Sequence, residues 1–281
     1  MNSKVEKLLL LPQFEQRSPQ WFEQRNNAIT ASDIPTVLGE NNYKTPLSLL
    51  IDKCAANPKP FVGNAATKWG THYEDIAIEK YSALRDKEVL SFGLLIHPEY
   101  PWLGGSPDGI TTDGILLEVK CPLTRKIVMG EVPHHYLSQV LLNLEICDLD
   151  IAHFIEFVPG NSDDNYQINI VEIKRDHEWF ARELPKMRKF WDSVLEARDK
   201  GIDTNPEYTS YKIRSDKRRK RSPPPKKEIP TNKFLFIDEP EEHVEHVKPE
   251  EHVKPEEHVK HVEHVKPKKP IKQKNVCLFV D

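Results

Sequence analysis

The chain has 281 residues, of which 38% are hydrophobic and 30% charged, and its formal net charge is −4. No apolar run approaches the roughly 18–20 residues of a transmembrane helix, since clusters such as Leu8–Leu11 and Gly93–Ile96 are strand-sized. The pattern of a signal peptide is lacking, and the cysteines are too far apart in sequence for a disulfide framework, a zinc site or an iron–sulfur cluster. We therefore expect an intracellular protein without a membrane segment.

The first third of the chain is predicted to be helical. Ser18 and Pro19 are typical of an N-cap and a first helical position, and Arg25 closes the helix that they begin. Further helices are predicted to begin at Thr30–Ile34 and to cover Thr45–Cys54 and Ala66–Arg85, with a loop at Pro58, Pro60 and Gly63.

Strands dominate the middle of the chain. They are predicted at Val89–His97, Trp102–Ser106, Ile115–Cys121, Ile151–Val158 and Tyr166–Lys174, the last two as a pair. A helix begins at Pro133, and a long amphipathic helix runs from about Asp176 to Lys200 and ends at Gly201. This order of helices and strands predicts an α/β domain with a mixed sheet.

The composition changes near residue 207. Residues 1–207 contain enough apolar side chains for one domain, whereas residues 208–281 are rich in Lys, Glu, Pro and His and are expected to be disordered. A basic cluster, Lys217–Arg221, is followed from Glu241 by an irregular repeat of Glu, His, Val, Lys and Pro. The basic cluster is typical of a nuclear localisation signal, a DNA tether or a solvated linker, and these alternatives stay open.

Two carboxylates and a lysine are predicted to converge at one edge of the sheet. Because side chains alternate along a strand, Glu118 and Lys120 point the same way, roughly 7 Å apart. A hairpin brings Asp108 back beside them. Such a set suits phosphodiester hydrolysis, in which the acids hold one or two Mg²⁺ ions and the lysine orients or deprotonates the attacking water. An ordinary Glu–Lys pair on a surface hairpin is the alternative.

Five blocks in order resemble the phage-lambda-type exonuclease, or YqaJ-like viral recombinase, family of the PD-(D/E)xK nuclease superfamily. The blocks are W-F-E-Q-R-N-N-A-I-T-A-S-D from Trp21, W-G-T-H-Y-E from Trp69, G-S-P-D-G from Gly105, L-E-V-K-C-P from Leu117 and Y-L-S-Q-V from Tyr136. They cover about residues 15–200. The resemblance implies a restriction-endonuclease-like core in residues 1–207, with a mixed central sheet flanked by helices.

The same resemblance implies a metal site. Asp108, Glu118 and the backbone carbonyl of Val119 are then the ligands of Mg²⁺, for which Mn²⁺ is expected to substitute. Lys120 is implied to be catalytic.

Two further residues are implied to support this chemistry. Glu74 corresponds to a glutamate that holds metal-bound waters, and Gln139 to a glutamine that lines the site. A glutamate at the helix edge and a plain polar helix residue are the respective alternatives. The five tryptophans are expected in the core.

A terminal 5′-phosphate is implied to bind at Arg25, with Ser32 and Ser106 assisting. A guanidinium suits a phosphate because it donates two parallel hydrogen bonds. The alternatives are a helix C-terminal cation for Arg25 and an N-cap for Ser32.

The resemblance thus implies a Mg²⁺-dependent exodeoxyribonuclease that degrades duplex DNA from 5′ ends in viral DNA recombination, repair or end processing. Its implied partners are double-stranded DNA ends, a single-strand annealing protein and further copies of the chain in a trimeric ring. A host nucleus or a viral replication site is the location that the basic cluster and this resemblance suggest. A structure-specific endonuclease and a catalytically inactive DNA-binding module are the alternatives, and the end-reading Arg25 block disfavours the endonuclease.

Overall fold

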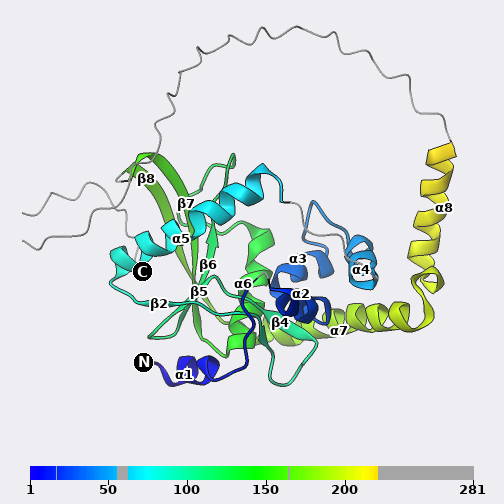
Figure 1. Cartoon of the computed structure of the whole chain (residues 1–281), viewed down its shortest axis with the longest axis horizontal. Coiled ribbons are helices and arrows are strands. Elements are labelled where there is room, and N and C mark those ends of the chain that lie inside the picture. The colour runs from blue at the N-terminus through cyan, green and yellow to red at the C-terminus, as the bar shows by residue number, and fades with distance from the viewer. Residues whose placement is uncertain (17, 56–62, 164, 221–281) are drawn as a thin grey trace, which may run out of the picture. The chain divides into compact units, whose positions relative to one another are not determined.

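The computed structural model describes residues 1–16, 18–55, 63–163 and 165–220. Its central sheet has five strands in the order β2-β5-β6-β7-β8 (Figure 1). They are β2 (Val89–Leu90), β5 (Gly109–Thr111), β6 (Ile115–Lys120), β7 (Ile151–Ser162) and β8 (Asn165–Lys174). Strands β6 and β7 run parallel, while the other neighbouring pairs are antiparallel. The sheet is therefore mixed, and the predicted fold class is confirmed.

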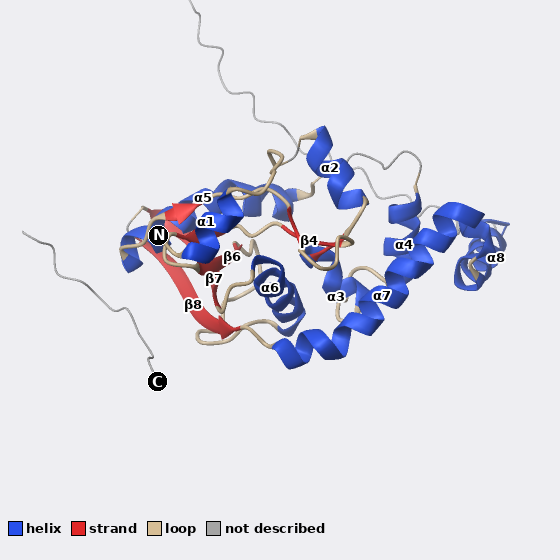
Figure 2. Ribbon diagram, turned by 90° about the horizontal axis from the view of Figure 1, so that it is seen from below, coloured by secondary structure: helices blue, strands red, loops and turns tan. Residues whose placement is uncertain are grey.

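Helices cover both faces of this sheet (Figure 2). The flanking helices are α5 (Ala65–Arg85), α6 (His134–Cys147) and α7 (His177–Lys200). Leu116 of β6 packs in the core that contains the apolar residues of α6 and α7. Its neighbours Leu117 and Val119 pack in a second core with Ala77 and Tyr81 of α5. The predicted alternation of side chains along β6 is therefore present.

A second, smaller sheet lies beside the central one. Its strands, in the order β1-β4-β3, are β1 (Ile29–Thr30), β4 (Leu103–Gly105) and β3 (Leu95–Ile96). The elements near them are α2 (Pro19–Asn26), the 3₁₀ helix η1 (Ala31–Asp33), α3 (Ile34–Val37) and α4 (Pro46–Cys54). The chain passes from β4 to β5 through Ser106–Asp108, so three residues connect the two sheets.

The predicted strand Val89–His97 is wrong as a single element. It divides into β2 and β3, which belong to different sheets. The division falls at Gly93, where the N-terminal segment crosses the chain: the Gly93 N–H donates to Gln13 Oε1 at 2.7 Å. A Cβ atom at Gly93 would lie 2.5 Å from the carbonyl oxygen of Phe14, so this crossing requires glycine.

The predicted helix ends are confirmed at their caps. Ser18 Oγ accepts from the Trp21 N–H at 3.2 Å, and Asp176 Oδ1 accepts from the Trp179 N–H at 2.8 Å. Gly201 follows α7 with φ of 90°, a conformation that favours glycine. Strand β5 was missed because it has only three residues. Of the predicted loop, Pro58 and Pro60 lie outside the described residues.

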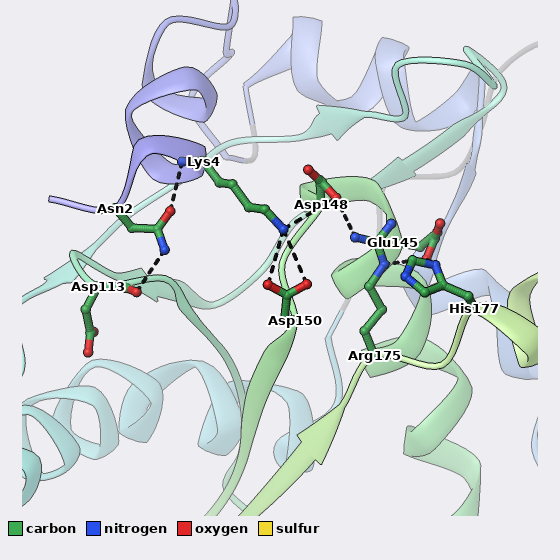
Figure 3. A network of polar contacts seen from close by, with 8 residues as sticks. All are labelled: Asn2, Lys4, Asp113, Glu145, Asp148, Asp150, Arg175 and His177. Carbon is green, nitrogen blue, oxygen red and sulfur yellow. Dashed lines mark hydrogen bonds and ion pairs between the residues drawn. The ribbon is translucent and has the colours of Figure 1, made fainter.

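The N-terminal residues form a helix, α1 (Ser3–Leu9), where only a strand-sized apolar cluster was expected. Asn2 caps the helix by accepting from the Lys4 N–H at 2.8 Å, and Val5 and Leu8 are buried in the main core. Polar contacts also hold α1 to the central sheet (Figure 3). Lys4 Nζ lies 3.2 Å from Asp150 Oδ2 at the start of β7.

The same network reaches α6 through an arginine between β8 and α7 (Figure 3). Arg175 Nε donates to Glu145 Oε2 at 2.7 Å, and its Nη1 donates to Asp148. The Arg175 and Glu145 side chains are only 11% and 10% exposed, so this ion pair is largely shielded from water.

The C-terminal end of the described chain is a helix, α8 (Pro206–Lys220), which crosses the boundary predicted at residue 207. The basic cluster begins in the last part of this helix, and Arg221 and the repeat from Glu241 lie outside the described residues. Within the described ranges, no helix is long and apolar enough to cross a membrane.

We predict that Arg175→Met lowers the free energy of unfolding by about 3 kcal/mol, because it leaves the shielded carboxylate of Glu145 without its cation. The matched change Lys200→Met removes an exposed pair with Glu196 and is expected to leave the free energy of unfolding almost unchanged. Urea denaturation of both variants measures the difference. Equal losses would show that the Arg175 pair is no better shielded than a surface pair.

Candidate active site

The predicted hairpin places Asp108 against strand β6. Strand β5 pairs with β6 so that Gly109 faces Leu117. The Asp108 N–H donates to the Leu117 carbonyl oxygen at 3.2 Å, and the Val119 N–H donates to Asp108 Oδ2 at 2.6 Å. The carboxylate of Asp108 is therefore fixed by the backbone immediately after Glu118.

Glu118 and Lys120 point together toward helix α6. Lys120 Nζ forms an ion pair with Glu118 Oε1, and Gln139 Nε2 donates to the same oxygen. The other oxygen, Oε2, accepts from Asn143 Nδ2 at 3.2 Å. Glu118 is 0% exposed, so a charged carboxylate in this position depends on these donors.

Asn143 was missed by the sequence analysis. It lies four residues after Gln139, on the same face of α6, and this spacing is the signal that could have identified it. Gly105 makes room for it, because a Cβ atom at Gly105 would lie 2.3 Å from Asn143 Oδ1. Asn143, which contacts Glu118, thus explains why position 105 is a glycine.

Burial and like charge perturb the titration of the acidic groups. Burial raises the pKa of Glu118 to about 7, with the charges of Asp108 and Glu74 acting in the same direction and Lys120 in the opposite one. Burial also raises the pKa of Asp108, although Lys120 and the Val119 N–H oppose it. For Lys120, burial acts against the charged form, but Glu118 and Asp108 outweigh it and raise its pKa. Negative charge is therefore in excess around these side chains.

The oxygen atoms here match the ligands that Mg²⁺ prefers. Mg²⁺ is commonly held by one or two carboxylates and keeps several waters. Asp108, Glu118 and the Val119 carbonyl would supply such a set, and a bound cation would favour the charged form of both buried carboxylates, which burial disfavours. Among the described residues, no group of three or more His, Cys, Asp or Glu side chains is arranged to hold a metal ion. The candidate set accordingly depends on two side chains and one backbone oxygen.

Arg25 and Ser32 lie together at the end of α2 and the start of η1. Arg25 Nη2 donates to Ser32 Oγ at 2.8 Å. The guanidinium carbon of Arg25 lies 4.5 Å from the centre of the Trp21 ring. Trp21 was expected in the core, but it is only partly buried and supports Arg25 instead.

Ser106 is held from two sides. Its Oγ donates to the Gly93 carbonyl oxygen at 3.2 Å and accepts from Gln16 Nε2 at 3.2 Å. Gln16 also donates to the Phe92 carbonyl oxygen at 3.1 Å. This glutamine was missed by the sequence analysis, because it precedes α2 in a segment without a recognisable motif.

One cavity of about 200 Å³ brings most of the predicted site residues together. Its lining includes the predicted phosphate-binding residues and three of the predicted catalytic residues: Arg25, Ser32, Ser106, Glu74, Asp108 and Gln139. Lys120 and Val119 line an adjoining cavity of about 420 Å³, to which Glu74 also contributes. Glu118 lines neither cavity, but it contacts Lys120, which lines the larger one, and Gln139, which lines the smaller one.

The fold is shared with exonucleases of known structure. The alkaline exonuclease LHK-Exo from Laribacter hongkongensis superposes with a TM-score of 0.56 at 24% identity, covering 70% of this chain and 99% of that one. Its complex with dAMP gives the same TM-score at 22% identity. The domain therefore has the fold of this exonuclease.

The sequence comparison finds one family model that matches part of the chain. Residues 20–150 match the YqaJ-like viral recombinase domain. This match confirms the predicted resemblance to that family over this part of the chain.

Relatives occur in large DNA viruses and in a bacterium. Protein R354 of Acanthamoeba polyphaga mimivirus is 35% identical over 172 residues, which are 55% of this chain and 31% of that protein. YqaJ of Bacillus subtilis is 27% identical over 197 residues, 67% of this chain and 60% of that protein. Protein D345L of African swine fever virus is 27% identical over 161 residues, 47% of this chain and 46% of that protein. The chain thus spans from about a third to three fifths of the length of these relatives.

We predict that the stabilisation of the protein by Mg²⁺ grows with pH. The folded metal-free protein keeps a proton on Glu118 up to about pH 7, well above the usual range of a glutamate. The contribution of Glu118 to the free energy of unfolding therefore falls as pH rises from about 4.5 to 7. Mg²⁺ competes with that proton, and its apparent affinity is expected to rise up to about tenfold per pH unit below 7.

Thermal unfolding with and without Mg²⁺ at pH 5.5 and pH 8 measures this effect, and Glu118→Gln should abolish the pH-dependent difference. An equal Mg²⁺ shift at both values of pH in the unmodified protein would contradict the assignment of Glu118.

Proposed function

We propose that the protein is a Mg²⁺-dependent exodeoxyribonuclease that degrades one strand of duplex DNA from a 5′ end. The single observation that carries the proposal is the shared cavity, in which Arg25 and two serines face the same space as Asp108 and Glu74. The match to the YqaJ-like viral recombinase domain and the fold shared with an exonuclease support a nuclease role. A role in viral DNA recombination agrees with the family description, and DNA repair and end processing are further roles that we propose.

The proposed reaction is hydrolysis of the phosphodiester nearest the strand end. Mg²⁺ bound at Asp108, Glu118 and the Val119 carbonyl would supply an activated water and stabilise the departing oxygen. Lys120 lies beside both carboxylates and would balance the negative charge of the attacked phosphate. Gln139 and Asn143 hold the Glu118 carboxylate in one orientation through both of its oxygens. Glu74 lines the cavity next to these groups and would orient water there.

The end of the strand would be recognised at the other side of the cavity. Arg25 carries a fixed charge whose orientation is set by Trp21 and Ser32. A terminal 5′-phosphate is a dianion near neutral pH, and a guanidinium with hydroxyl donors beside it is a suitable receptor. An internal phosphodiester carries one charge and lacks the additional oxygen, so this part of the cavity favours ends over closed duplex.

Binding partners follow from the same proposal. Double-stranded DNA ends are the proposed substrate, and a single-strand annealing protein would receive the strand that is left. A trimeric ring of this chain, which the family resemblance implies, would keep the enzyme on the duplex between cleavage steps. Sedimentation of the protein with and without duplex DNA tests the ring.

We predict that Lys120→Ala and Asp108→Ala each lower the rate of digestion by at least about a hundredfold, because each removes one preorganised charge from the reacting phosphate or its metal. Duplex binding should be largely unchanged. Lys126→Ala is the matched control, since Lys126 is exposed on the loop that follows β6. Digestion of an end-labelled duplex in Mg²⁺ and in EDTA measures the rates, and substantial digestion by either active-site variant would reject the assignment.

We predict that a 5′-phosphorylated blunt duplex is degraded about ten- to a hundredfold faster than its 5′-hydroxyl counterpart, which corresponds to about 1.5–3 kcal/mol from charge-assisted contacts. Arg25→Ala should remove this preference while slow Mg²⁺-dependent cleavage persists. Arg182→Ala, which alters an arginine that is 63% exposed on α7, should keep it.

A covalently closed circular duplex should resist the enzyme in the same assay. Rapid conversion of the circle to a linear form would favour an endonuclease on the same core. The absence of any Mg²⁺-dependent cleavage, with DNA binding retained, would favour an inactive DNA-binding module.

A further inference from the structure

A closed ring of polar contacts surrounds the base of Arg25. On one side, Arg25 Nη2 donates to Ser32 Oγ at 2.8 Å, and Ser32 Oγ lies 3.1 Å from Thr30 Oγ1. Thr30 Oγ1 donates to Asp33 Oδ2 at 2.9 Å. On the other side, Lys53 Nζ lies 2.9 Å from Asp33 Oδ2 and donates to the Arg25 carbonyl oxygen at 2.6 Å. The ring therefore begins and ends at Arg25.

Lys53 is fully occupied within this ring. An ammonium group has three donors, and those of Lys53 face the carbonyl oxygens of Arg25 and Ala28 and the carboxylate of Asp33. The side chain is 8% exposed. It is not among the residues that line the cavity of about 200 Å³. Lys53 therefore acts on a ligand in that cavity only through Arg25 and its neighbours.

A second cation fixes the same segment from α7. Arg198 Nη2 donates to the carbonyl oxygens of Asn26 and Lys53 at 2.7 and 2.8 Å. Consecutive backbone carbonyls at the end of α2, those of Arg25 and Asn26, are thus bound by side chains from α4 and α7. Because Arg25 lies at this end of α2, the position of the backbone here sets the position of the Arg25 guanidinium.

Asp33 supplies the negative charge of the ring. Burial alone would raise the pKa of Asp33, but the charge of Lys53 and the Thr30 N–H outweigh burial and hold the pKa below its ordinary value. Asp33 is therefore ionised near neutral pH. Its carboxylate fixes Lys53 and Thr30 at once, and through Thr30 it fixes Ser32.

We propose that Lys53 and Asp33 are positioning residues for strand-end recognition, which set Arg25 and Ser32 in the orientation that binds a terminal 5′-phosphate. This inference rests on the proposed function and deepens it. It assigns recognition of the end to a buried ion pair that does not touch the substrate. The acidic half of the cavity is held separately, by β6 and α6, so loss of the ring should impair end recognition and spare the cleavage chemistry.

The test compares a single and a double variant. Lys53→Met leaves Asp33 charged and shielded, so it should lower stability. Lys53→Met combined with Asp33→Asn removes both charges, keeps a side-chain acceptor for Thr30 and should restore much of that stability. Lys44→Met is the matched control. Lys44 lies just before α4, outside the ring, and pairs with Asp52, whose side chain is 62% exposed. Thermal unfolding of the four proteins is measured first.

Recognition is then measured without cleavage. Binding of a fluorescent hairpin duplex with a 5′-phosphate or a 5′-hydroxyl is followed by anisotropy in EDTA, and digestion of the hydroxyl duplex is followed in Mg²⁺. The unmodified protein and Lys44→Met should bind the phosphorylated end at least about tenfold more tightly, as expected for charge-assisted contacts. Both Lys53 variants should bind the two ends within about threefold, a difference below 1 kcal/mol. Their digestion of the hydroxyl duplex should stay within about twofold of the unmodified rate, a difference of less than half a kcal/mol.

Two outcomes would overturn the positioning role. Retention of the phosphate preference in the double variant would show that the ring does not set Arg25. Alternatively, Lys53→Met could lose the phosphate preference and the double variant could regain both the preference and the stability. That result would show that Lys53 acts through stability alone. If the unmodified protein itself bound both ends equally, end recognition at Arg25 would be rejected together with this inference. The Mg²⁺ digestion assay would still decide separately whether the protein is a nuclease.

Discussion

The buried carboxylate of Glu118 is the constraint on which the site depends. A charged group that is 0% exposed is costly unless every oxygen has a partner, and Glu118 receives donors from Lys120, Gln139 and Asn143. Those partners require α6 to pack closely against β6, which in turn requires a glycine at position 105. The close packing of α6 therefore both completes the fold and supplies the hydrogen bonds that the buried Glu118 carboxylate needs.

The two sheets carry different residues of the cavity. The central sheet carries Asp108 and Glu118, while the small sheet and η1 carry the region of Ser32 and Ser106. The segment that connects β4 with β5 belongs to both, because Ser106 and Asp108 lie two residues apart within it. A shift of one sheet relative to the other would separate the Ser106 hydroxyl from the Asp108 carboxylate, so this short connection keeps the two parts of the cavity in register.

Much of the acidic half could be predicted from the sequence, because it is local. Alternation along one strand and one hairpin place Asp108, Glu118 and Lys120, and the structure confirms both features. The contacts that depend on distant segments were not predictable in this way. Asn143 meets Gly105, Gln16 meets Ser106, and Lys53 meets the end of α2 only after the chain has folded. Trp21 was assigned to the core for a similar reason, since its hydrophobicity does not reveal that an arginine stacks on it.

The two ends of the cavity carry opposite charge. At one end, Arg25 and the buried Lys53 are opposed by the single carboxylate of Asp33, which leaves a positive excess. At the other, Glu74, Asp108 and Glu118 are opposed by Lys120, which leaves a negative excess that a divalent cation would neutralise. In the proposed function, a strand end with two charges on its terminal phosphate would be attracted to the positive end, and its next phosphodiester would extend toward the acids. The charge distribution would then orient a bound strand, with its terminal phosphate at Arg25 and its reacting bond beside Asp108.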